Sequence, residues 1–284
     1  MSLDERDLRD LEKAVNLLEQ NTITETITQV VGKPIDYLMD KLPKGAEEQI
    51  HSLVETALHK AADAALWSLD NEPNREASTK TNKIFAAVSG AVGGAFGFTA
   101  LAIELPISTT IMLRSVADVA RSEGFDLNDS RTKIACLEVF ALGGPSEDDD
   151  AVDTAYYATR NFTAEAMQVL SKELTEIAAK QASKNLTPTQ TGKWLAALIE
   201  KIAARFGVVI TEKAAAQAVP IIGAFAGATL NTMFTDYYQD MARGHFIIKR
   251  LENKCDPKVV KAEYEKMALL RNSELTKNRH LNLE

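Results

Sequence analysis

The chain has 284 residues, of which 45% are hydrophobic and 25% are charged, and its formal net charge at neutral pH is −8. This balance is typical of a folded globular protein and excludes disorder as the dominant state. The acidic excess argues against nucleic acid as a partner, because binding a phosphate backbone requires clustered Lys and Arg.

The two cysteines and the first residues bear on the cellular compartment. Cys136 and Cys255 are too far apart in sequence for a CxxC redox pair or a local zinc site, so we expect both to be reduced and buried. The first ten residues are strongly charged and contain no apolar segment or cleavage site of a signal peptide. This predicts a cytoplasmic protein.

Apolar residues recur at helical spacing along most of the chain, and no convincing period-two strand is present. The clearest stripe runs from Ile50 to Leu69, after Pro43 and Gly45 and before the turn-forming residues 70–74. The same reasoning predicts helices over 4–20, 22–31, 81–104, 107–123, 129–142, 147–182, 189–213, 216–250 and 257–275. The sequence therefore predicts an all-α fold, with one multi-helix domain.

Acidic residues near two predicted helix starts fit capping. Asp129 or Asn128 is expected to cap the helix that carries Cys136, because short polar side chains accept from the first free N–H groups. The acidic run 148–150 follows Ser146 and is interpreted as a helix first turn, since it lacks the alternating ligands and the glycine of a calcium loop. We predict no metal site and no cofactor.

The most apolar segment lies near the middle of the chain. Residues 84–103 carry no charge over twenty positions, enough to cross a bilayer, although their many small residues also fit a buried helix in a soluble protein. Glycines four residues apart form a face for close helix packing, so we expect a Gly/Ala-rich hairpin, 84–123, to pack against 216–243. The predicted packing glycines are Gly90, Gly93, Gly94, Gly97, Gly223 and Gly227. Bilayer insertion of this hairpin stays open.

Five charged residues sit among apolar neighbours, where an ionised group must be paired or shift its pKa. They are Glu104, Arg114, Asp118, Glu138 and Asp236. Arg114 and Asp118 are one helical turn apart and can meet, while Arg114 and Asp236 would pair across two packed helices. One interpretation is a buried polar cluster that binds a small ligand or performs acid–base chemistry; the other is a structural ion-pair network. Whether the five converge stays open.

Familiar catalytic motifs are absent from the sequence. The glycines of 90–97 lack the Lys-Ser or Lys-Thr of a P-loop, the four histidines lack metal-ligand spacing, and no GxSxG elbow occurs. His245 is interpreted as a surface or helix-end residue and the pair Tyr237–Tyr238 as packing residues. This favours a protein that is not an enzyme, although a triad assembled from distant residues stays open.

Three central blocks, 90–106, 113–118 and 136–144, resemble the EcsC protein family, and the flanking segments 32–38 and 220–224 are similar to it as well. The likeness covers roughly residues 30–250. We accordingly divide the chain into an N-terminal helical extension (1–29), an EcsC-like helical domain (30–250) and a charged C-terminal helix and tail (251–284). The family takes its name from a bacterial operon that also encodes an ABC transporter, and the resemblance carries over no catalytic residue.

Together these observations predict a non-enzymatic accessory or regulatory protein of the bacterial cytoplasm. Peripheral association with the inner face of the cell membrane, or with a membrane protein such as a transporter, is left open. The alternative is an enzyme or small-ligand-binding protein that uses the five charged residues. The substrate or ligand and the oligomeric state are not indicated by the sequence.

Overall fold

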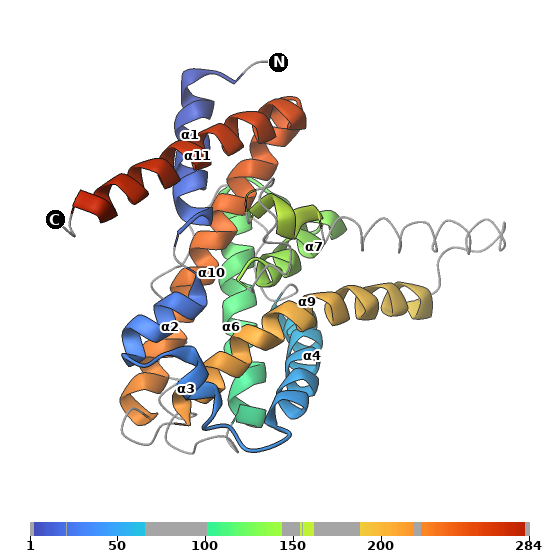
Figure 1. The fold of residues 1–284 in the computed structure, drawn as a ribbon. Helices are drawn as coiled ribbons and strands as arrows, with labels where there is room; N and C mark the ends of the chain where they lie inside the picture. The colour runs from blue at the N-terminus through green and yellow to red at the C-terminus, as the bar shows by residue number, and fades with distance from the viewer. Residues whose placement is uncertain are drawn as a thin grey trace.

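The structure is a computed structural model, and it describes residues 3–20, 22–65, 101–143, 154, 156–161, 188–218 and 223–281. Within these ranges every regular element is helical, which confirms the predicted all-α fold (Figure 1). The elements are α1 (Glu5–Leu18), α2 (Ile23–Val31), α3 (Ile35–Met39), α4 (Ala46–Ala65), α6 (Leu101–Ser122), α7 (Ser130–Glu138), the 3-10 turn η2 (Val139–Ala141), α9 (Pro188–Gln217), α10 (Gly223–Lys254) and α11 (Pro257–Leu281). Residues 156–161 are helical as well.

Local sequence signals account for several helix ends. Asp4 caps α1 and Thr22 caps α2, each in a reciprocal capping box with the acidic residue three positions later. Gly32 ends α2 at a φ of 68°, a left-handed conformation that glycine adopts without steric cost. Asp129 caps α7 by accepting from the Arg131 N–H, as predicted. These ends follow from residues adjacent in sequence.

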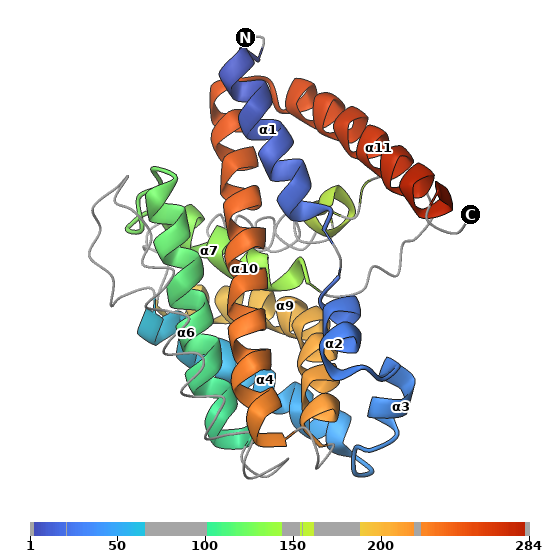
Figure 2. The same ribbon diagram turned by 90° about the vertical axis from the view of Figure 1, so that its left-hand side faces the viewer.

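Helix α10 forms the axis of the fold (Figure 2). Helix α6 lies beside it and runs in the same direction, while α4 packs closely against both α6 and α9. Helix α1 packs along the second half of α10, and α11 turns back to lie across α1. The core is one continuous cluster of buried apolar side chains that draws on all of these helices.

Several predicted boundaries are wrong, and two of them have a clear physical reason. Pro106 was expected to separate two helices, but it lies inside α6. The bond that proline removes is the one to the carbonyl of Ala102, and Ala102 is exposed, so water can solvate that carbonyl. The helix predicted over 216–250 begins instead at Gly223, because the buried alanines 214–216 extend α9 to Gln217.

Much of the predicted glycine-rich hairpin lies outside the described residues, including Gly90, Gly93, Gly94 and Gly97. Most of the helix predicted over 147–182, with the acidic run 148–150, also lies outside them. Gly223 and Gly227 belong to the first turns of α10. The packing of α6 against α10, the described part of the expected hairpin contact, is present.

Two other glycines show close packing that the sequence analysis did not single out. A Cβ on Gly244 of α10 would lie 2.5 Å from Leu18 Cγ of α1, and a Cβ on Gly143 would lie 2.7 Å from the Tyr238 hydroxyl oxygen. Both positions therefore exclude any larger side chain unless their neighbours move. Both cysteines are buried and free, as expected, and burial raises the pKa of the Cys136 thiol.

Candidate functional site

Glu104, the first of the predicted charges, is fixed inside the core. It lies in the first turn of α6, where its Oε1 accepts from Lys213 Nζ of α9 at 3.0 Å and from Asn231 Nδ2 of α10 at 2.8 Å. Lys213 is fully buried and Glu104 is 4% exposed. Burial alone would raise the pKa of Glu104, but the Lys213 charge and these hydrogen bonds outweigh it and lower the pKa. This is a water-excluded ion pair that joins three helices.

Arg114 and Asp118 do not form the pair that their spacing suggested. Arg114 is exposed, whereas Asp118 is 1% exposed and pairs with Arg121 one turn further along α6. A buried carboxylate needs a positive partner, and here the partner is also buried. Asp118 therefore belongs to a buried structural ion pair.

Glu138 lies at the end of α7 beside two basic residues of α10. Its Oε2 is 3.5 Å from Lys249 Nζ and 3.7 Å from His245 Nε2. Burial raises the pKa of Glu138, but His245 and Lys249 together bring it down to about 2, so the side chain is an anion at neutral pH. These contacts hold α7 against α10.

His245 corrects the expectation of a surface or helix-end residue. It lies within α10, is 1% exposed, and its Nδ1 is 3.1 Å from the hydroxyl oxygen of Tyr156. Burial is the main cause that lowers the pKa of His245 to about 4, against the opposing influence of Glu138. The imidazole is therefore neutral at physiological pH and enclosed by the protein.

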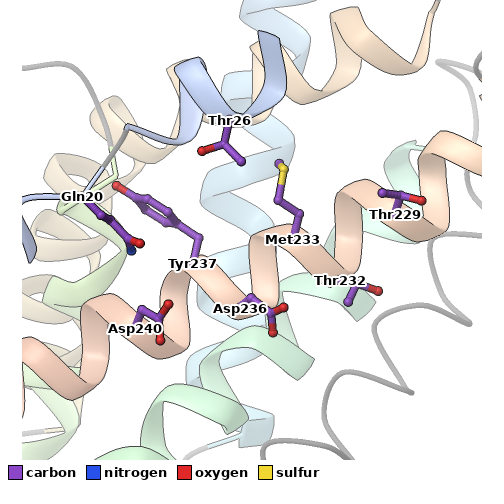
Figure 3. A pocket seen from close by; sticks show the side chains of 8 residues that line it. All are labelled: Gln20, Thr26, Thr229, Thr232, Met233, Asp236, Tyr237 and Asp240. Carbon is purple, nitrogen blue, oxygen red and sulfur yellow. The ribbon is translucent and has the colours of Figure 1, made fainter. Parts of the chain in front are cut away.

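Asp236 lies apart from these pairs, on the wall of a solvent-open groove of about 550 Å³ between α2 and α10 (Figure 3). We call this the α2–α10 groove. Its lining consists of Gln20, Thr26, Thr229, Thr232, Met233, Asp236, Tyr237 and Asp240. Six of these residues form one stripe along α10, because positions three and four apart share a helix face. Gln20 follows α1, and Thr26 belongs to α2.

The electrostatic character of the α2–α10 groove is acidic. Among the eight described residues that line it, Asp236 and Asp240 are carboxylates, the others are uncharged, and no Lys or Arg is present. Burial and the nearby charges of Glu25 and Glu19 raise the pKa of Tyr237, so its hydroxyl stays protonated. The groove thus offers negative charge and neutral hydrogen-bonding groups.

Two polar groups in the wall of the groove are largely withdrawn from water. Tyr237 is 9% exposed, and its ring lies beside the Gln20 side chain (Figure 3). The Gln20 amide nitrogen, Nε2, is buried and has no hydrogen-bond partner among the described residues. A buried donor without an acceptor is unfavourable, so a bound group with a lone pair would be stabilised there.

Asp236 was predicted from the sequence, but most of the other groove residues and the partners of the buried acids were not. Lys213 is the one basic residue in the mostly apolar stretch 206–217 of α9, and that position is a usable signal. Gln20 and Thr26 carry no comparable signal, because only the packing of α1 and α2 brings them to α10. Tyr238 is a packing residue, as expected, with its ring centroid 5.0 Å from that of Phe140.

Neither a metal-binding cluster nor a membrane-spanning helix is found in the part of the chain that the structure describes. No three side chains of His, Cys, Asp or Glu gather there in a way that could hold a metal ion. No described helix is both long enough and apolar enough to cross a membrane.

Comparisons with known proteins place the chain in a family. A scan of protein families matches residues 4–251 to the EcsC protein family, so the match also includes α1 and α2, ahead of the region where the likeness was expected. Searches of curated proteins and of solved structures returned no match. Because the family match spans most of the 284 residues, the chain belongs to the EcsC protein family.

Proposed function

We propose that this protein is a non-enzymatic accessory protein of the cytoplasm that binds a Lys- or Arg-rich segment of a membrane protein in the α2–α10 groove. The observation that carries the proposal is the lining of the groove. Two carboxylates, Asp236 and Asp240, stand one turn apart on an open wall that contains no basic side chain among its described residues. A peptide segment with Lys or Arg side chains one helical turn apart matches the spacing and the charge of these two carboxylates.

The wider charge of the protein supports a basic partner. The formal net charge is −8, and Glu19 and Glu25 lie close enough to the groove to raise the pKa of Tyr237. A cleft lined by one sign of charge concentrates ligands of the opposite sign and accelerates their association. A cationic segment is therefore attracted before it makes contact.

A membrane protein is the partner class that best fits this chemistry. Cytoplasmic loops of membrane proteins carry an excess of Lys and Arg close to their membrane-spanning helices. An acidic groove that is open to solvent can receive such a loop, because an extended or helical segment needs no enclosed cavity. This partner class also agrees with the role expected from the sequence.

Binding is favoured over catalysis by the identity of the groove residues. The eight described lining residues include no histidine, cysteine or lysine, and the raised pKa of Tyr237 makes its hydroxyl a weak acid. The other predicted charges, Glu104, Asp118 and Glu138, are engaged with buried or largely buried partners. The groove therefore supplies recognition groups without an activated nucleophile.

The test is binding of a fluorescent peptide of alternating Lys and Ala, followed by anisotropy at about 50 mM and about 300 mM salt. We expect Asp236→Asn/Asp240→Asn to weaken binding about tenfold at low salt, since each exposed ion pair contributes up to about 1 kcal/mol. The matched control is Glu12→Gln/Glu47→Gln, which removes the same charge from exposed positions outside the groove. Equal loss of affinity in both double variants would show non-specific attraction and refute the proposal.

A second candidate function, direct contact with a membrane surface, is favoured by the start of α6. Ile103 and Ile107 lie one turn apart and are 72% and 48% exposed. Large apolar side chains at such exposure suit insertion at the level of lipid headgroups.

We expect Ile103→Glu/Ile107→Glu to abolish flotation with anionic or neutral vesicles. The control Leu269→Glu/Leu270→Glu alters an equally exposed apolar pair on α11, and loss of flotation only there would reject α6 as the contact.

A further inference from the structure

A second, smaller pocket lies where the start of α7 meets the last turns of α10, and we call it the α7–α10 pocket. Its volume is about 260 Å³, and its wall includes Asp129, Arg131 and Thr132 from α7 and its cap, with Lys249 and Glu252 from α10. It is separate from the α2–α10 groove, and none of its lining residues belongs to that groove. What the pocket can bind follows from which of its polar groups are already engaged.

The two carboxylates of the α7–α10 pocket are occupied by internal partners. Asp129 accepts from the Arg131 N–H at 2.9 Å, and its other oxygen lies 3.1 Å from the Arg131 guanidinium. Glu252 holds the Arg160 guanidinium by two hydrogen bonds, at 2.7 and 2.9 Å. Each acid is thus paired with a guanidinium, which reduces its attraction for a cationic ligand.

The donors of the pocket are less fully used. Lys249 Nζ has one carboxylate neighbour among the described residues, Glu138 Oε2 at 3.5 Å, and an ammonium has three N–H groups. Thr132 is 5% exposed and lines the pocket, and its hydroxyl has no hydrogen-bond partner in the described part of the chain. The hydroxyl is accessible from the pocket and can donate to or accept from a bound group.

The helix adds a further attraction for negative charge. Thr132 is the third residue of α7, and the first N–H groups of a helix carry partial positive charge and lack acceptors within the helix. The Asp129 side chain satisfies the Arg131 N–H. The N-terminus of α7, the Thr132 hydroxyl and the Lys249 ammonium therefore present donors to the same small space.

We propose that the α7–α10 pocket binds the oxyanion group of a small molecule, a phosphate or a carboxylate, with Lys249 and Thr132 as its protein ligands. The ion pairs Asp129–Arg131 and Glu252–Arg160 border the bound anion and hold the wall in place. Lys249 also contacts Glu138, so the bound anion shares its ammonium with the carboxylate that secures α7 to α10.

The experiment titrates the full-length protein with inorganic phosphate and with acetate by calorimetry. We expect saturable binding of at least one anion, weakened about tenfold by Lys249→Gln and several-fold by Thr132→Val, because charge-assisted hydrogen bonds are stronger than neutral ones. The valine variant keeps the shape of the side chain, so it reports on the hydroxyl even if loss of Lys249 disturbs the fold. Lys258→Gln removes an exposed lysine outside the pocket and should leave binding unchanged.

Three results would overturn the proposal. They are no saturable binding of either anion, equal affinity in the wild type and both pocket variants, and an equal loss in Lys258→Gln. A parallel flotation with vesicles that contain phosphatidic acid separates the two sources of a phosphate group. Binding to vesicles without binding of free phosphate would reject a small-molecule site.

Discussion

Two faces of α10 carry polar groups in opposite settings. On the core face, Asn231 donates to Glu104, which forms a water-excluded ion pair with Lys213, whereas on the groove face the half-buried Asp236 and Asp240 line a solvent-open groove. The sequence left open whether the five charged residues converge, and the structure separates Glu104, in a core ion pair, from Asp236, in the wall of the groove. An acid among apolar neighbours in the sequence can therefore lie in either setting.

The largest expected effect on stability comes from removing the Glu104 carboxylate of the core ion pair. Glu104→Ala leaves the fully buried Lys213 without its partner, so we expect the free energy of unfolding to fall by about 3–5 kcal/mol. Urea denaturation measures this change. The double variant Glu104→Leu/Lys213→Met removes both charges and should recover most of the loss. A loss below about 1 kcal/mol in Glu104→Ala would show that water reaches this pair.

Acid should weaken the core face through His245. Its pKa in the folded state is lowered to about 4, from an ordinary value of 6.5, so between these values the unfolded chain binds a proton that the folded protein excludes. Stability is therefore present above pH 6.5 and lost as the pH falls toward 4, by up to about 3 kcal/mol. Below pH 4.5, protonation of Glu138, whose pKa is lowered to about 2, adds to the loss.

Thermal unfolding across this pH range measures the effect. His245→Gln should flatten the dependence between pH 6.5 and 4.5, and because His245 also lowers the pKa of Glu138, it should reduce the loss below pH 4.5. If the variant and the wild type follow the same curve between pH 6.5 and 4, His245 is not the group responsible.

Close packing on the core face predicts a smaller effect. In Gly244→Ala the new Cβ would lie 2.5 Å from Leu18 Cγ, and the displacement of α1 should cost about 1–3 kcal/mol in chemical denaturation. Gly207→Ala in α9 is the matched control, since its Cβ would be 3.4 Å from the nearest atom, on His51, and alanine favours a helix. Similar losses in both variants would remove the distinction between tight and ordinary contact.

The groove face should be nearly neutral for stability. Asp236→Asn/Asp240→Asn is expected to change the free energy of unfolding by no more than about 0.5 kcal/mol, while it weakens binding of the basic peptide. The same denaturation assay measures this. A decrease of more than about 2 kcal/mol in the free energy of unfolding would show that these carboxylates are structural, like those of the core ion pairs.

Local patterns in the sequence account for the helices and for several of their ends. Helical periodicity predicted α1 and α2 near their observed bounds, and Asp129 was one of the two residues expected to cap α7. The helix boundary predicted at Pro106 is wrong, because a single missing hydrogen bond is tolerated where water solvates the carbonyl. Signals of this kind depend on residues within a few positions of each other.

The candidate sites depend on contacts that no local pattern contains. Glu104 was recognised, but its partners Lys213 and Asn231 are 109 and 127 residues away. The close approach of Gly244 to Leu18 depends on how two distant helices are rotated about their axes. Such pairings are set by tertiary packing, and one sequence read by itself gives no co-varying positions from which to infer them.

The pairing of α1 with α10 has a consequence for the order in which the chain is made. Hydrogen bonds from Arg250 and Lys254 to the acids of α1 span 240 to 250 residues. The ribosome releases α1 long before α10, so the face of α1 that packs on α10 can be covered by it only after the residues around Gly244 and Arg250 emerge. While the chain between the two helices is being made, α1 lacks this packing partner.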